Sequence, residues 1–228
     1  LHLSLRRQRQ MCIRDSIKTG LNFTNYKIDN AWHEIRNKYF GTAEEADLYE
    51  PNILGDSTLY ADVYKVDPIE MSAFIQDKME FDEMVINIGL RYDNFNPNSP
   101  VPSDRRNPAN QLSLPDSMTS SYPKAKAQTQ ISPRFGLAYQ LGDAAVLHFS
   151  YGHFFQMPPM YSLFQNHSFL IAPNDYSTVM GNAELKAEKT VTYEIGLWQQ
   201  LFPGAGLEVS LFYRDIYNLL STRIFSTY

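Results

Sequence analysis

Hydrophobic and polar residues alternate with a period of two along most of the chain after residue 16. In the segment 84–93 (MVINIGLRYD), one face carries only Met, Ile, Leu and Tyr, while the other carries Asn, Gly, Arg and Asp with one Val. Such alternation is typical of a β-strand whose two faces meet different environments. The same pattern predicts strands at 17–28, 71–81, 131–141, 145–154, 191–198 and 207–214.

The predicted strands are long. Five of the seven run for ten to twelve residues, whereas strands of globular proteins usually have about five or six. A strand that crosses a membrane needs about nine to eleven residues because it is tilted. The strand length therefore favours a membrane barrel over a soluble sandwich.

Short and long connections alternate between these strands. The short ones lie around 80–83, 142–144 and 202–206, and the long ones at 29–67, 96–130 and 158–188. Structureless loops of more than about 15 residues are uncommon in compact domains. Bacterial outer-membrane barrels combine short periplasmic turns with long extracellular loops. The fold class predicted is an all-β, antiparallel up-and-down transmembrane β-barrel.

Composition excludes several other classes of protein. No stretch approaches about 18 consecutive apolar residues, so no transmembrane helix is predicted. The net charge of −5 provides no basic surface for nucleic acid. The single cysteine, Cys12, excludes an intrachain disulfide framework and a cysteine-based zinc site.

The first sixteen residues (LHLSLRRQRQMCIRDS) differ from the rest of the chain. They have a charge of +3 and neither the apolar region nor the cleavage site of a secretory signal. The run MCIRDS resembles translated adapter sequence. We expect 1–16 to be a non-native or disordered leader and 17–228 to form the barrel portion.

Glycines and charged residues share the polar face of the predicted strands. Glycine inside a strand indicates either a bend or the close approach of another backbone, such as a plug inside a barrel. The glycines concerned are Gly20, Gly89, Gly136, Gly152 and Gly196. The residues expected to face the barrel lumen are Arg91, Asp93, Arg134, His148, Glu194 and Arg214. These side chains either pair with one another or with a plug, or they contact a solute in transit.

Several segments resemble motifs of the TonB-dependent outer-membrane receptors. Residues 182–196 (NAELKAEKTVTYEIG) are similar to the pattern NPxLKPExSxxYExG, with alanines in place of the usual prolines. Residues 131–139 (ISPRFGLAY) are similar to SPRxGxxY, and 150–159 (SYGHFFQMPP) to SYGxFFxxPP. Further likenesses are SAFIQDK at 72–78, LRYD at 90–93 and FYRDIY at 212–217. All six motifs occur in the family's order, and they are most similar to the larger receptors of the Bacteroidetes type.

The resemblance implies a barrel of about twenty-two strands with an N-terminal plug domain and a TonB box. The chain contains neither a plug nor a TonB box, so we expect a partial barrel without the C-terminal strands. The implied function is energised import of a scarce bulky solute, such as a siderophore, cobalamin or an oligosaccharide, across the outer membrane of a Gram-negative bacterium. The implied partners are outer-membrane lipid, the TonB complex acting through the plug, the extracellular ligand and a surface lipoprotein. Two other functions stay open: a passive porin-type barrel and a secreted β-rich binding module.

The long connection 158–188 is the candidate for ligand capture. It presents aromatic planes that stack on sugars or flat chelates, together with amide and imidazole groups that fix orientation. The candidate residues are Tyr161, Phe164, Asn166, His167, Phe169 and Tyr176. The alternative is that these rings pack the loops onto one another.

The sequence predicts no enzyme, no metal site and no cofactor. His148 and Ser150 lie two residues apart on one face, but no third group is spaced to orient them for catalysis. His33, His153 and His167 are scattered without the spacing of metal ligands.

Overall fold

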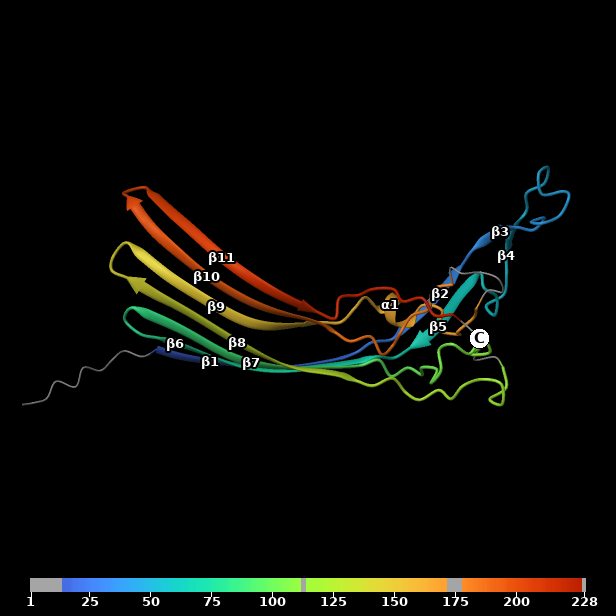
Figure 1. Cartoon of the computed structure of the whole chain (residues 1–228), viewed down its shortest axis with the longest axis horizontal. Coiled ribbons are helices and arrows are strands. Elements are labelled where there is room, and N and C mark those ends of the chain that lie inside the picture. Colours follow the sequence, from blue (N-terminus) through green and yellow to red (C-terminus); the bar gives the residue numbers. More distant parts are fainter. Residues whose placement is uncertain (1–13, 112–113, 172–177, 227–228) are drawn as a thin grey trace, which may run out of the picture.

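A computed structural model describes residues 14–111, 114–171 and 178–226 of the 228-residue chain. Seven long strands form one open antiparallel sheet, which curves along its length (Figure 1). In order across the sheet, the strands are β1 (Arg14–Asn25), β6 (Ile69–Glu80), β7 (Met84–Asn96), β8 (Gln128–Leu141), β9 (Ala145–Gln156), β10 (Glu188–Phe202) and β11 (Ala205–Tyr217).

All seven predicted strands and all three short turns are confirmed. Most strands extend beyond their predicted ends, since the hydrogen-bonded ladder continues where the apolar alternation fades. β1 begins at Arg14, where it pairs with Glu80, and ends at Asn25, so the strand lies three residues before the predicted 17–28 at both ends. Residues 1–13 of the predicted leader lie outside the described residues.

The long connections contain structure that the alternation did not predict. In the first, β2 (Ile28–His33) pairs with β5 (Ala61–Val66), and β3 (Ile35–Asn37) pairs with β4 (Pro51–Ile53). In the third, α1 (Met160–Phe164) makes a single helical turn. In the described ranges, no helix has the length and apolar composition needed to cross a membrane.

The strand register places like residues on the same face of the sheet. Directly paired residues of neighbouring strands share a face. One row across the sheet runs through Ile86, Leu137, Phe149, Ile195 and Leu211. The adjacent row on the opposite face runs through Asn87, Gly136, Ser150, Glu194 and Phe212, which is polar except at its last member. The sheet therefore has one apolar face and one polar face, as the alternation predicts.

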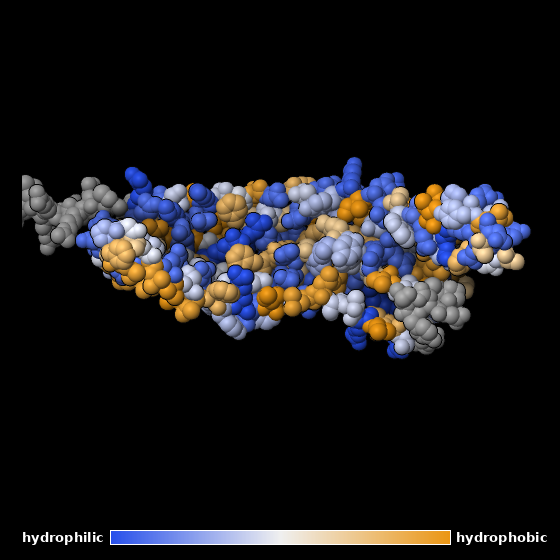
Figure 2. Space-filling view, turned by 90° about the horizontal axis from the view of Figure 1, so that it is seen from above, coloured by the Kyte–Doolittle hydropathy of each residue, from blue (hydrophilic) through white to orange (hydrophobic). Residues whose placement is uncertain are grey.

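The apolar face of the sheet is uncovered. Leu211 is 68% exposed and Ile195 is 46% exposed, and hydrophobic side chains follow the lower margin of the strand half in Figure 2. Contiguous exposed apolar surface of this extent marks contact with another apolar phase or partner. The buried hydrophobic cluster lies instead among the long connections, at one end of the strands.

Pairing between β8 and β9 is shorter than between the other neighbours. It runs from the turn to the Arg134–Gly152 pair and stops one residue before Pro133. Proline has no N–H to donate to a ladder and is found where pairing is interrupted. Beyond this point β8 pairs only with β7, and β9 pairs only with β10.

The two faces should differ in their tolerance of charge. An arginine at Phe149 or Ile195 is expected to cost about 2–4 kcal/mol of stability in a lipid bilayer near its midplane, because the side chain faces hydrocarbon. An arginine at Ser150 or Thr192, on the polar face, should cost much less. Denaturant unfolding of the intact barrel in lipid vesicles measures both, and equal costs would contradict the assignment of faces.

Candidate functional site

A trough of about 900 Å³ runs across the polar face of the sheet. Residues of strands β6 to β11 line it. Three glycines contribute to this hollow, because they have no side chain that would project into it: Gly89, Gly136 and Gly152. Its charged lining residues are Arg91, Arg134, Glu194 and Arg214, four of the six residues predicted to face the lumen. The other two, Asp93 and His148, lie on the same face by strand register.

Arg91 and Asp93 form an ion pair at one edge of the trough. The Arg91 Nε–H donates to both carboxylate oxygens of Asp93, at 2.8 and 3.1 Å. The two residues are two apart on β7, so their side chains project from the same face. The Asp93 side chain is only 7% exposed, and a carboxylate at this depth requires such a partner.

Arg134 and Arg214 contact aromatic rings rather than a carboxylate. Their guanidinium groups lie over the rings of Phe154, at 4.9 Å, and Phe212, at 5.0 Å. Within the described part of the chain, neither arginine forms an ion pair. Among the described residues, the pairing of lumen charges with one another is seen for Arg91 and Asp93. Pairing of the other lumen charges with a plug stays a prediction.

Two glycines of the polar face make room for side chains of the neighbouring strand. Gly196 of β10 pairs with His148 of β9, and a methyl group at Gly196 would overlap the imidazole ring. Gly20 of β1 stands in the same relation to the ring of Phe74 in β6. At these two positions, cross-strand packing is a reason for glycine that the sequence analysis did not consider.

The three long connections share one hydrophobic core, the loop cluster. It contains residues from all three connections and from the ends of adjoining strands. Its buried members are Tyr64, Val66, Phe95, Val101, Ala125, Leu163, Phe164 and Ala183. The loops are therefore packed against one another at one end of the sheet, beside α1, β2 and β5 (Figure 1).

Of the residues predicted to capture ligand, some are buried and at least one is exposed. Phe164 is 1% exposed inside the loop cluster, and Phe169 is 5% exposed beside the ring of Tyr122. Both are packing residues here, as the alternative interpretation predicts. Tyr161, at the start of α1, is 60% exposed. Tyr176 lies outside the described residues.

Asn166 and His167 join the connections to one another. Asn166 adopts a φ of 50°, its side chain exchanges two hydrogen bonds with the backbone of Leu170, and its own N–H donates to Asp62 at 3.1 Å. The ring of His167 lies 5.8 Å from that of Tyr64. Burial lowers the pKa of His167, against the opposing effect of the Asp62 carboxylate.

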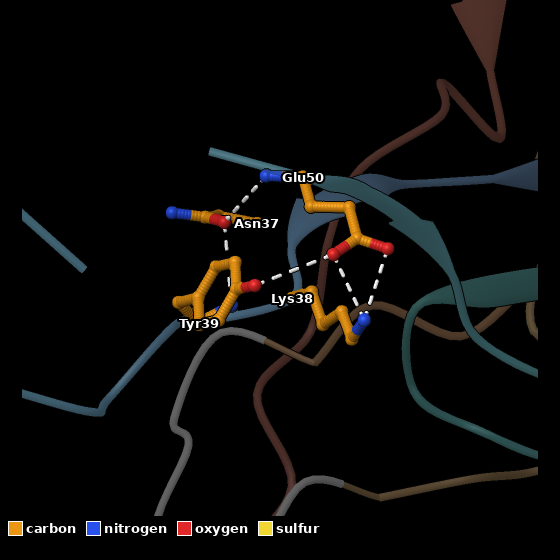
Figure 3. A network of polar contacts seen from close by, with 4 residues as sticks. All are labelled: Asn37, Lys38, Tyr39 and Glu50. Atoms are coloured by element: carbon orange, nitrogen blue, oxygen red, sulfur yellow. Dashed lines mark hydrogen bonds and ion pairs between the residues drawn. The ribbon is translucent and has the colours of Figure 1, made fainter. Parts of the chain in front are cut away.

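A polar network orders the hairpin of β3 and β4, at the far end of the first long connection (Figure 3). Lys38 Nζ donates to both oxygens of Glu50, at 2.9 and 2.8 Å, and the side-chain oxygen of Asn37 accepts from the N–H groups of Tyr39 and Glu50. The Lys38–Glu50 hydrogen bond raises the pKa of Lys38 and lowers that of Glu50.

The hydrophobic alternation did not predict this hairpin. Arg36 lies between the rings of Phe40 and Tyr60, 4.1 Å from each centroid. The only signal in the sequence was the cluster of aromatic and charged residues in a segment otherwise taken to be a loop.

Across the described residues, no group of three or more His, Cys, Asp or Glu side chains is arranged to hold a metal ion.

Comparison with known proteins identifies the family. The family model described as "TonB dependent receptor-like, beta-barrel" matches residues 10–228. The chain belongs to the TonB-dependent receptor family. No curated protein matches it. The open sheet is accordingly part of a TonB-dependent receptor barrel, a kind of protein found in Gram-negative outer membranes.

Two solved receptor structures have the same fold. The chain is 18% identical to the FrpB iron transporter from Neisseria meningitidis, with a TM-score of 0.50, over 89% of this chain and 26% of that one. It is 18% identical to the ferric enterobactin receptor PfeA, with a TM-score of 0.54, over 91% of this chain and 25% of that one. The chain thus spans about a quarter of the length of either receptor.

Substitution of Gly196 tests the cross-strand packing. In a full-length receptor, Gly196→Ala should cost about 1–3 kcal/mol of stability, because the added methyl group overpacks against His148. Adding His148→Ala should recover most of the loss. Thermal unfolding of the two single variants and the double variant measures the coupling, and additive losses would contradict the contact.

Acidification should loosen the loop cluster through His167. A histidine whose folded-state pKa is lowered contributes stability above its unfolded pKa of about 6.5, and this stability is lost as the pH falls and the ring must be charged. The protection of the amides of α1 and β5 against hydrogen exchange, taken relative to the intrinsic exchange rate at each pH, should therefore fall between pH 7 and pH 5. A His167→Gln variant should lack most of this pH dependence. If the pH dependence of this variant is unchanged, a titratable group other than His167 causes it.

Proposed function

We propose that this chain is the barrel portion of an outer-membrane receptor that imports a scarce, bulky solute with energy delivered through TonB. The solute classes that fit are a siderophore, cobalamin or an oligosaccharide. The proposal is supported chiefly by the family match together with one observation: three long loops close over one end of a sheet whose polar face carries a charged trough.

The loop cluster and the trough fit successive steps of import. Loops held together by a common core form a stable extracellular surface, on which the exposed side chain of Tyr161 is accessible to a ligand. The trough on the lumen side would meet a plug domain or the passing solute. Arg134 and Arg214 suit anionic groups, because each has a guanidinium group without an ion pair among the described residues. The polar face, which would line the lumen, also carries Asp93, His148 and Glu194.

The proposed partners follow from this arrangement. Outer-membrane lipid covers the apolar face, the TonB complex acts through a plug domain, and the extracellular ligand binds above the loop cluster. A surface lipoprotein is a further partner, for which the exposed hairpin of β3 and β4 offers a surface. The family match favours the receptor over the passive porin and the secreted module.

Dependence on TonB is the decisive test of the function. Cells expressing the full-length receptor as their sole route for the solute should lose uptake when TonB is deleted. Binding of the solute at the cell surface should persist, because capture does not consume energy. A passive porin would retain uptake, and a secreted module would leave the cell envelope free of the protein.

The role of Tyr161 can be tested separately. Tyr161→Ala in the full-length receptor should weaken ligand binding about tenfold, the loss of roughly one aromatic stacking contact. The heat stability of the barrel on gels should not change, since the side chain is exposed. Tyr176→Ala is the companion variant on the same loop. If neither substitution affects binding, capture lies in 29–67, in 96–130 or in other loops of the receptor.

A further inference from the structure

Asp77 interrupts the apolar face of the sheet. It lies on β6 between Ile75 and Met79 of the same face, and its cross-strand partners are Ile17 in β1 and Ile88 in β7. All four neighbours are hydrophobic, so none of the side chains directly beside Asp77 on this face offers it a polar contact. Both flanking strands are part of the structure, which means that the immediate surroundings of Asp77 within the sheet are complete.

One carboxylate oxygen of Asp77 has no partner. Oδ1 is buried and accepts no hydrogen bond from the described residues. The same face of β1, β6, β7 and β8 carries no Lys or Arg, as the strand register shows, and its only other acid is Asp15. The neighbouring Lys78 projects from the opposite face, where it pairs with Glu80. Among the described residues, Asp77 forms no ion pair with a cation of these strands.

A groove beside Asp77 offers space for an aliphatic chain. It has a volume of about 470 Å³. Besides Asp77, its lining consists of Ile75, Ile88, Gly89, Leu90, Pro133, Arg134, Phe135 and Tyr151. Pro133 lies where β8 and β9 cease to pair. A volume of this size is within the usual range of about 300–1,000 Å³ for small-molecule sites. The groove thus combines a largely apolar wall with the Asp77 carboxylate, while Arg134, which lies on the opposite face by strand register, contributes to its lining.

The position of Asp77 along β6 indicates which part of a lipid would contact it. Asp77 lies three residues before the end of β6, where the short turn begins. At about 3.3 Å per residue, this is about 10 Å along a tilted strand. In a receptor barrel the short turns are periplasmic, so Asp77 lies near the headgroups of the periplasmic leaflet.

We propose that the groove binds a phospholipid with a primary ammonium headgroup, such as phosphatidylethanolamine. The ammonium group would donate a hydrogen bond to Asp77 and neutralise its charge, while an acyl chain fills the groove along Leu90, Pro133 and Phe135. An ionisable residue inside a membrane is costly and usually marks a functional contact. The inference rests on the proposed placement of this face in the outer membrane.

Lipid retention by the full-length receptor tests the proposal. The delipidated receptor in detergent is titrated with phosphatidylethanolamine or with phosphatidylglycerol of the same acyl chains, and bound lipid is counted by native mass spectrometry. The wild-type receptor should retain phosphatidylethanolamine about tenfold more tightly than the anionic lipid, as expected for a hydrogen bond between charged groups. Asp77→Asn, which keeps the shape of the side chain, should abolish this preference.

Two controls separate the possible failures. Asp82→Asn removes an exposed carboxylate in the adjacent turn and should leave the preference intact. Asp77→Glu keeps the charge and should retain much of the preference if Asp77→Asn perturbs folding. Equal retention of both lipids by the wild-type receptor, or an unchanged preference in Asp77→Asn, would overturn the lipid site. A full-length protein that stays soluble without detergent would instead overturn the proposed function.

Discussion

The interaction on which the structure depends is the in-register hydrogen-bond ladder between the seven long strands. In a membrane, every backbone N–H and C=O must be paired within the protein, because hydrocarbon offers no substitute. A register error of one residue would turn a strand's apolar set to the opposite face. Rows such as Ile86, Leu137 and Phe149 persist across several strands because the register is maintained at each pairing. The departure beyond Pro133 is local and leaves each strand paired on its other side.

The same ladder organises the polar face. Large and small residues oppose one another in cross-strand pairs, so that His148 occupies the space over Gly196 and Phe74 the space over Gly20. Where glycine faces no large neighbour, as at Gly89 and Gly136, the surface is hollow and contributes to the trough. The pattern of side-chain size thus determines where the lumen wall is filled and where it can receive a plug or a solute.

The sheet contributes little buried hydrophobic core, which lies in the loop cluster instead. Phe95, at the end of β7, is fully buried there and contacts residues brought from the other two connections. This division fits a membrane protein, in which lipid covers the apolar face and only the water-exposed end needs an internal core. The packing of Phe164 and the hydrogen bonds of Asn166 anchor the loop that carries Tyr161, and such preorganisation lowers the entropic cost of binding.

The strands, their two faces and the family could all be predicted from the sequence alone. Alternation with a period of two is a local property, so it could be read without any knowledge of neighbours, and the order of the six motifs sufficed for the resemblance. Three features became apparent only from the packing of the folded chain: the burial of Phe164 and Phe169, the lack of ion pairs at Arg134 and Arg214 among the described residues, and the isolation of Asp77 on an apolar surface. These facts depend on residues far apart in the chain. The hydrogen bond from Asn166 to Asp62 spans 104 positions, and no periodicity can predict a contact formed when separate loops pack together.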